Sequence, residues 1–138
     1  MHRRFRFSLE PVLTVRQADR DGRRSALADA ARRLQTLHAQ LDDVRRTLAA
    51  LRQHTRGSLA SGTIDLPRLQ SWHGYDTVLR EQLGTLQSEA VRAGEEVERQ
   101  RQAVAEADRQ VRELEKLRER QHERWKVALA RNRDFGDK

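Results

Sequence analysis

Apolar residues recur every seven positions along two long stretches of the chain, with a second apolar position three residues after each. In the first stretch these positions are Leu27, Ala30, Leu34, Leu37, Leu41, Val44, Leu48 and Leu51. In the second they are Leu83, Leu86, Ala90, Ala93, Val97, Gln100, Val104, Ala107, Val111 and Leu114. Residues at this spacing share one face of a helix, and the period is that of a coiled coil. The pattern predicts two amphipathic helices, the second with a narrower, alanine-rich face.

The first helix has a recognisable start. Ser8 is a favourable N-cap residue, and Pro11 would lie in the first turn, where a missing N–H does little harm. Phe7 before the cap and Val12 after it have the spacing of a hydrophobic staple. The sequence therefore predicts a helix that begins at about residue 9.

The end of this helix and the start of the next are also marked. Gly57 is a natural C-cap, and the stretch from Gly57 to Ile64 is rich in Gly and Ser. Asp65 then repeats the start signal, with Ile64 before it and Pro67 in the first turn. We expect a loop over 57–65.

These signals predict an all-α fold, a long two-helix antiparallel coiled-coil hairpin. Helix one is expected over about 9–56 and helix two over about 66–132, within a single domain at 1–138 that has frayed termini. A short loop makes the two helices run antiparallel.

Folding back at this loop would place Leu51 near Ser71 and Leu9 near Leu114. Helix two would then overhang helix one by about 30 Å, at 1.5 Å per residue. Because the two apolar faces can cover each other, we expect a monomer. A swapped dimer of long helices is the alternative.

Composition supports a thin helical protein rather than a thick globular core. Hydrophobic and charged residues each make up 36% of the chain, aromatic residues make up 4%, and there are 0 cysteines. A typical globular domain is nearer half apolar and a quarter charged. The lack of cysteine excludes disulfides, thiolate metal sites and cysteine nucleophiles.

The net charge of +7 is concentrated at the two ends of the chain. Residues 1–24 contain seven arginines and three acidic residues, and residues 116–138 contain eight basic and four acidic residues. Residues 25–115 contain thirteen basic and fourteen acidic residues. In an antiparallel hairpin the two basic ends would lie together.

No pattern typical of an active site or a metal site occurs. The five histidines, His2, His38, His54, His73 and His122, include no pair at the helical i, i+4 spacing of a metal site. The sequence contains no P-loop, no GxGxxG and no GxSxG. We expect a protein that is not an enzyme and needs neither cofactor nor metal.

Two segments carry a resemblance to a known family. The opening Phe5-Arg-Phe-Ser-Leu-Glu-Pro-Val-Leu13, followed by Arg16, resembles the start of the FliJ family of flagellar type III export proteins. The spacing of Leu69, Trp72, Tyr75 and Leu79 is similar to the family's segment after the loop. The chain departs from the family at Thr47 and Leu51, where some members have aromatic residues.

The resemblance implies a cytoplasmic protein, peripheral to the inner membrane at the flagellar base. Family members resemble the stalk subunit of rotary ATPases and insert both termini into the hexamer of the export ATPase. Their other end contacts the cytoplasmic linker of the export gate membrane protein, and they escort empty export chaperones. Whether this chain belongs to a flagellum or to a related injection system stays open.

Two sets of candidate contact residues follow. A basic set with apolar anchors is expected to contact the ATPase: Arg3, Arg4, Arg6, Arg118, Arg120, Arg124, Trp125 and Lys126, with Val127 beside them. The resemblance implies gate contacts at Tyr75, Leu79 and Gln40, and we add Trp72. We expect Tyr75 and Leu79 to lie outside the core.

Two other functions are compatible with the composition. A pI of about 11.0 permits nucleic-acid binding, although the basic ends match no known nucleic-acid-binding module. A generic structural scaffold is the second alternative, and the aromatic pair Trp72 and Tyr75 argues against it.

Overall fold

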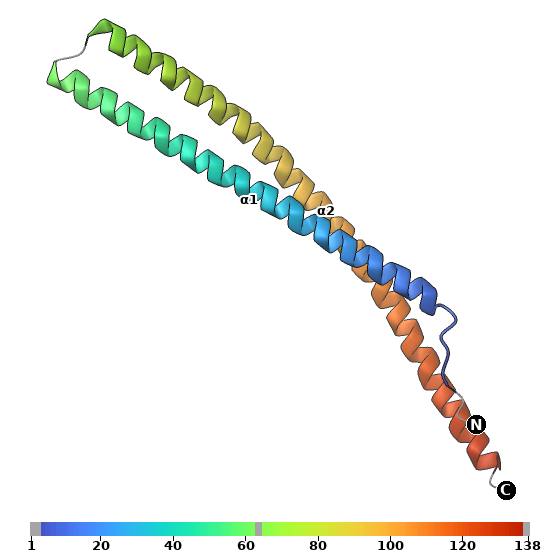
Figure 1. Ribbon diagram of the computed structural model, residues 1–138. Coiled ribbons are helices and arrows are strands. Elements are labelled where there is room, and N and C mark those ends of the chain that lie inside the picture. Colours follow the sequence, from blue (N-terminus) through green and yellow to red (C-terminus); the bar gives the residue numbers. More distant parts are fainter. Residues whose placement is uncertain (1–3, 63–64, 137–138) are drawn as a thin grey trace. The chain divides into compact units, whose positions relative to one another are not determined.

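The computed structural model describes residues 4–62 and 65–136 of the chain. Two helices make up most of it: α1 at Glu10–Ser61, with 52 residues, and α2 at Leu66–Gly136, with 71 residues. The chain leaves α1, crosses a short connection and returns antiparallel in α2 (Figure 1). The described residues contain no strand. The predicted all-α helical hairpin is confirmed.

The hairpin divides into two compact units, each containing a part of both helices. Unit 1 combines Met1–Leu27 with Arg99–Lys138, and unit 2 is Ala28–Glu98. Each unit has a buried cluster of its own, to which both of its helix segments contribute.

The heptad faces form these cores, as predicted. In unit 2, Leu37, Leu41, Ala90 and Ala93 form one buried cluster, with Leu34, Leu83 and Leu86 packed against it. In unit 1, Phe7, Leu13 and Val111 form another, with Phe5, Leu9, Leu114 and Leu117 packed against it. Burial of each Leu or Val side chain contributes about 1.5–3 kcal/mol to folding. Leu9 and Leu114, which the predicted register placed near each other, both pack against this second cluster.

The start of α1 differs from the prediction. The Leu13 N–H donates to the Leu9 carbonyl at 2.9 Å, and the Glu10 N–H donates to the Phe7 carbonyl at 3.1 Å. Leu9 therefore occupies the cap position, and the predicted Ser8 cap is wrong. The predicted staple partner is also wrong: Val12 is 42% exposed, whereas Leu13 shares the buried cluster with Phe7. Burial of Phe7 against Val111 outweighs the local preference of Ser8 for a cap.

The loop is shorter than predicted because α1 continues through Gly57 to Ser61. One interior glycine costs a helix only about 1 kcal/mol, which does not end it. The chain leaves α1 at Gly62, whose φ of 73° is readily accessible to glycine. The predicted cap of α2 is confirmed, because the Arg68 N–H donates to the Asp65 carboxylate at 3.0 Å. Ile64 lies outside the described residues.

Candidate functional site

An aromatic cluster joins the N-terminal segment to α2 in unit 1. The Phe5 ring lies 4.7 Å from the His122 ring and 6.0 Å from the Trp125 ring, measured between centroids. His122 and Trp125 stack on each other at 5.8 Å with an interplanar angle of 15°. We call these three residues the terminal cluster. It holds residues on both sides of Phe5 close to α2, beyond the start of α1.

Exposed arginines lie next to the residues of the terminal cluster in the sequence. Arg4 and Arg6 flank Phe5, and Arg120 and Arg124 belong to the same stretch of α2 as His122 and Trp125. These four have no hydrogen-bond or ion-pair partner among the described residues. The segment therefore contributes two unpaired positive charges and α2 contributes two more to the same end of unit 1, which we call the basic end.

The remaining residues of the predicted ATPase contact behave differently. Arg118 bonds the Glu10 carboxylate at 3.0 Å, and Lys126 pairs with Glu123 at 3.4 Å. Both cations are thus partly neutralised. Arg3 lies outside the described residues. Val127 is 52% exposed and lines a shallow groove on α2 with Glu123, Arg124, Ala128, Arg131 and Asn132.

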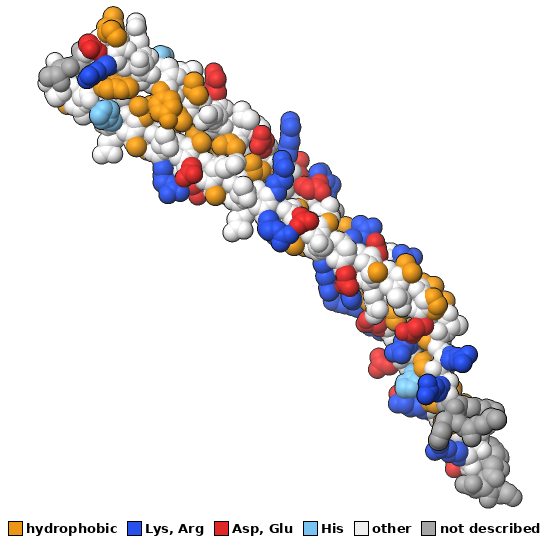
Figure 2. Space-filling view, in the orientation of Figure 1, with side chains coloured by type: hydrophobic (Ala, Val, Ile, Leu, Met, Phe, Trp, Pro, Cys, Tyr) orange, Lys and Arg blue, Asp and Glu red, His pale blue; other side chains and the backbone are white. Residues whose placement is uncertain are grey.

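In unit 2, the structure separates the four predicted gate residues. Tyr75 is 49% exposed and Gln40 is exposed, whereas Leu79 is only 4% exposed. The expectation that Leu79 lies outside the core is wrong. Its heptad relation to Leu83 and Leu86 places it on the packed face of α2, which four-residue spacing from Tyr75 did not reveal. Figure 2 shows hydrophobic side chains gathered near the loop-proximal part of this unit.

Gln40 borders a groove that we call the Val78 groove. Its lining consists of Gln40, Asp43, Val44, Val78, Glu81, Gln82, Thr85 and Leu86. Val78 is 48% exposed and lies one turn after Tyr75. Tyr75 and Gln40 therefore belong to the same flank of unit 2.

Trp72 belongs to a different groove, which we call the Trp72 groove. Its lining consists of Leu51, Arg52, Thr55, Arg56, Leu69, Trp72, His73, Asp76 and Arg80. The two grooves share no residue. Asp76 and Val78 point about 200° apart on α2, at about 100° per residue. The grooves therefore lie on opposite flanks of the hairpin, and the four predicted gate residues do not form one patch.

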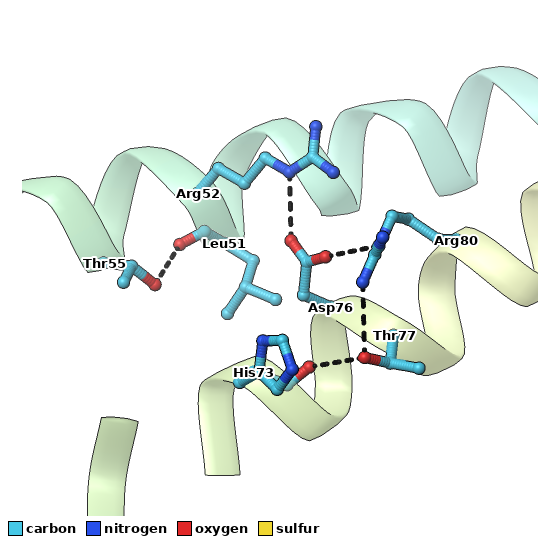
Figure 3. A network of polar contacts seen from close by, with 7 residues as sticks. All are labelled: Leu51, Arg52, Thr55, His73, Asp76, Thr77 and Arg80. Carbon is cyan, nitrogen blue, oxygen red and sulfur yellow. Dashed lines mark hydrogen bonds and ion pairs between the residues drawn. The ribbon is translucent and has the colours of Figure 1, made fainter. Parts of the chain in front are cut away.

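The Trp72 groove contains a polar network that sequence reasoning missed (Figure 3). The Asp76 carboxylate bonds Arg52 Nε at 3.0 Å and Arg80 Nε at 2.8 Å. The hydrogen bond from Arg52, then the charges of Arg52 and Arg80, hold the pKa of Asp76 below its ordinary value. The i, i+4 spacing of Asp76 and Arg80 is visible in the sequence. The bond to Arg52 depends on the register between the helices.

A second carboxylate with a lowered pKa lies in unit 1. The hydrogen bond from Arg109 lowers the pKa of Glu106 and raises that of Arg109 in return. Both groups are exposed on α2 and three residues apart. This is a surface ion pair within a single helix, of a kind that contributes little to stability.

The described residues contain no group of three or more His, Cys, Asp or Glu side chains placed to hold a metal ion. The two grooves of unit 2 are open to solvent, and neither encloses a set of converging catalytic groups. Within the described part of the chain, no helix combines the length and the apolar character needed to cross a membrane.

Comparison with known proteins gives a family. A family model described as Flagellar FliJ protein matches residues 5–132, which is nearly the whole chain. No curated protein and no solved structure matches the chain significantly. The matched region includes the terminal cluster and both grooves. On this match over two antiparallel helices, the chain belongs to the FliJ family of flagellar proteins, which are components of type III export.

Proposed function

We propose that this protein is a non-enzymatic component of flagellar type III export that docks its basic end on the export ATPase hexamer as a stalk. The observation that carries the proposal is the terminal cluster. Through the tilted ring contacts of Phe5 with His122 and Trp125, it holds arginines from both ends of the chain at one end of unit 1.

The basic end suits an acidic opening in a ring-shaped partner. Arg4, Arg6, Arg120 and Arg124 supply unpaired charge for electrostatic steering, which raises association rates. Val127 offers exposed apolar area for anchorage beside them. Arg118 and Lys126, already paired with carboxylates, contribute less.

We further propose that unit 2 contacts the export gate through Tyr75 and Gln40, along the Val78 groove. A half-exposed tyrosine offers a large contact area at small entropic cost, and its hydroxyl tolerates water before binding. Leu79 supports this flank from the core rather than touching the partner. Escort of export chaperones is the third part of the proposal and rests on family membership alone.

The docking proposal is tested by stimulation of purified export ATPase. Changing Arg4, Arg6, Arg120 and Arg124 together to Gln should reduce stimulation about tenfold or more, because several rim charges act together. A control variant changes Arg32, Arg33, Arg45 and Arg46 to Gln; these are four exposed arginines of unit 2. Equal stimulation by both variants, at unchanged helicity, would refute docking through the basic end. The nucleic-acid alternative would be favoured if the wild type bound single-stranded RNA, the variant of the basic end did not, and the wild type had no effect on the ATPase.

A further inference from the structure

The Trp72 groove combines apolar lining with an excess of positive charge. Leu51, Leu69 and Trp72 supply the apolar part. His54 contacts Trp72 edge-on, with centroids 5.2 Å apart and an interplanar angle of 80°. This contact and the surrounding helices restrict the indole, so little rotational freedom remains to be lost when a ligand covers it.

The charge excess comes from three arginines around a single carboxylate. Arg52, Arg56 and Arg80 all line the groove, and Asp76 is its one acidic residue. Arg56 has no hydrogen-bond or ion-pair partner among the described residues. Two positive charges in the groove are therefore unbalanced.

Asp76 pairs with two of these arginines through their Nε atoms, so that terminal guanidinium nitrogens are left to bind a ligand. Its carboxylate forms an ion pair with Nε of Arg52 at 3.0 Å and with Nε of Arg80 at 2.8 Å. The terminal nitrogens of Arg52 lie away from the Asp76 carboxylate (Figure 3) and bond no other described residue. One terminal nitrogen of Arg80 donates a long hydrogen bond, of 3.4 Å, to the Thr77 hydroxyl. A guanidinium fixed at Nε keeps donors for a second carboxylate.

We propose that the Trp72 groove is a docking site for an acidic amphipathic segment of a partner protein. One apolar side chain of that segment packs on Trp72 and Leu69, and flanking carboxylates bond Arg52, Arg56 and Arg80. This site shares no lining residue with the Val78 groove, does not include Tyr75 or Gln40, and belongs to neither surface of the proposed function. It can fail while that function holds.

The groove favours an acidic protein segment over nucleic acid. Strands of nucleic acid bind along a continuous positive track with successive aromatic platforms. Here Trp72 is the one indole or phenyl ring in the lining, and the Asp76 carboxylate lies between the arginines, where it repels a run of phosphates. Separate carboxylates can bond the arginines on either side of it.

The test uses the full-length chain with Trp125→Phe, so that the remaining indole, Trp72, reports on the groove by its fluorescence. The probe is a short amphipathic peptide with Leu and Phe on one face and glutamates beside them. A peptide with Gln at each Glu position is the control ligand. We expect saturable binding of the Glu peptide with a change in Trp72 fluorescence, weakening as salt rises, and at least about tenfold weaker binding of the Gln peptide.

Two matched variants distinguish binding in the Trp72 groove from electrostatic attraction of the Glu peptide to the positively charged protein as a whole. Arg52→Gln with Arg56→Gln should weaken binding of the Glu peptide about tenfold or more. Arg45→Gln with Arg46→Gln removes the same charge from the same helix outside the groove, and should change affinity less than about twofold. Equal loss in both variants would overturn the proposal.

Asp76→Asn gives the sharper comparison. This variant makes the groove more positive, so attraction by net charge alone predicts tighter binding of the Glu peptide. If Asp76 positions Arg52 and Arg80, affinity should instead fall about threefold or more, since ordering both side chains adds a cost to binding. Tighter binding at unchanged helicity would overturn the positioning role. The proposed site would be overturned if the Glu peptide caused no change in Trp72 fluorescence. It would also be overturned if the protein bound single-stranded RNA more tightly than the Glu peptide.

Discussion

Leu79 and Tyr75 lie one turn apart on α2, yet the structure gives them different roles. Leu79 is 4% exposed and Tyr75 is 49% exposed. Each residue is changed to Ala in a variant of its own. One variant loses a core side chain of α2, and the other loses a surface side chain of the same helix.

The structure sets the expected magnitudes. Truncation of a buried leucine costs about 2–5 kcal/mol, from lost burial and the cavity left behind. Half of the area of a tyrosine is about 100 Å², which gives about 2.5 kcal/mol as an upper limit. Residual burial in the unfolded chain and the better helix propensity of Ala reduce this to about 1.5 kcal/mol or less. Leu79→Ala should therefore cost more stability than Tyr75→Ala, by about 0.5 kcal/mol or more.

Urea and thermal unfolding followed by circular dichroism measure both variants. In a chain of 138 residues, each kcal/mol lowers the melting temperature by about 3–4 °C, so Leu79→Ala should lower it by roughly 6–20 °C. Affinity for the gate's cytoplasmic fragment, measured well below both transitions, should fall for Tyr75→Ala by about tenfold or more. Equal losses of stability, or an unchanged melting temperature for Leu79→Ala, would refute the assignment of Leu79 to the core.

Other substitutions test two glycines, the Asp76 ion pair and the terminal cluster. Gly84→Ala should raise the stability of the free protein by about 1 kcal/mol, because an added Cβ meets nothing within 4 Å; a loss in urea unfolding would contradict this. Gly62→Ala should instead lower stability by about 1 kcal/mol, because φ there is 73°. The wild type should exceed Asp76→Asn in stability at neutral pH, since the lowered pKa of Asp76 contributes stability above its unfolded value of about 3.9. That difference should shrink as pH falls through the lower, folded pKa, and a constant difference from pH 7 to pH 2 would contradict the ion pair. Phe5→Ala should expose Trp125 to water, shift its emission to the red and reduce ATPase stimulation; unchanged emission would show that the ring contact does not form in solution.

The sequence was sufficient for the fold because the heptad faces repeat many times. Leu37, Leu41, Ala90 and Ala93 were predicted for the packed faces and are buried there. A repeat of this length cannot pack in a different way without exposing a whole row of apolar side chains. Asp65 was also predictable as a cap, since its hydrogen bond to the Arg68 N–H is local.

Predictions that depended on a single local signal were less successful. Ser8 was a good cap by type, but the position of the first turn depends on Phe7, which packs on Val111 far away in the sequence. Leu79 was expected at the surface because the family resemblance paired it with Tyr75, four residues before it, as a gate contact. A row of residues four apart drifts around a helix by about 40° per step, so one turn can lead from the surface into the core.

The error at Gly57 explains why the Trp72 groove was not predicted. Ending helix one at Gly57 would place residue 51 opposite residue 71, and hence Arg52 opposite Gln70. Because α1 continues to Ser61, the partner of Arg52 lies more than one turn further along α2, at Asp76. In a helical hairpin, lengthening the first helix at the turn shifts the register, so that every residue of the first helix faces a residue further along the second helix. The Arg52–Asp76 bond, and with it the charge arrangement of the groove, therefore depends on where the chain leaves α1 at Gly62, a feature that no heptad repeat encodes.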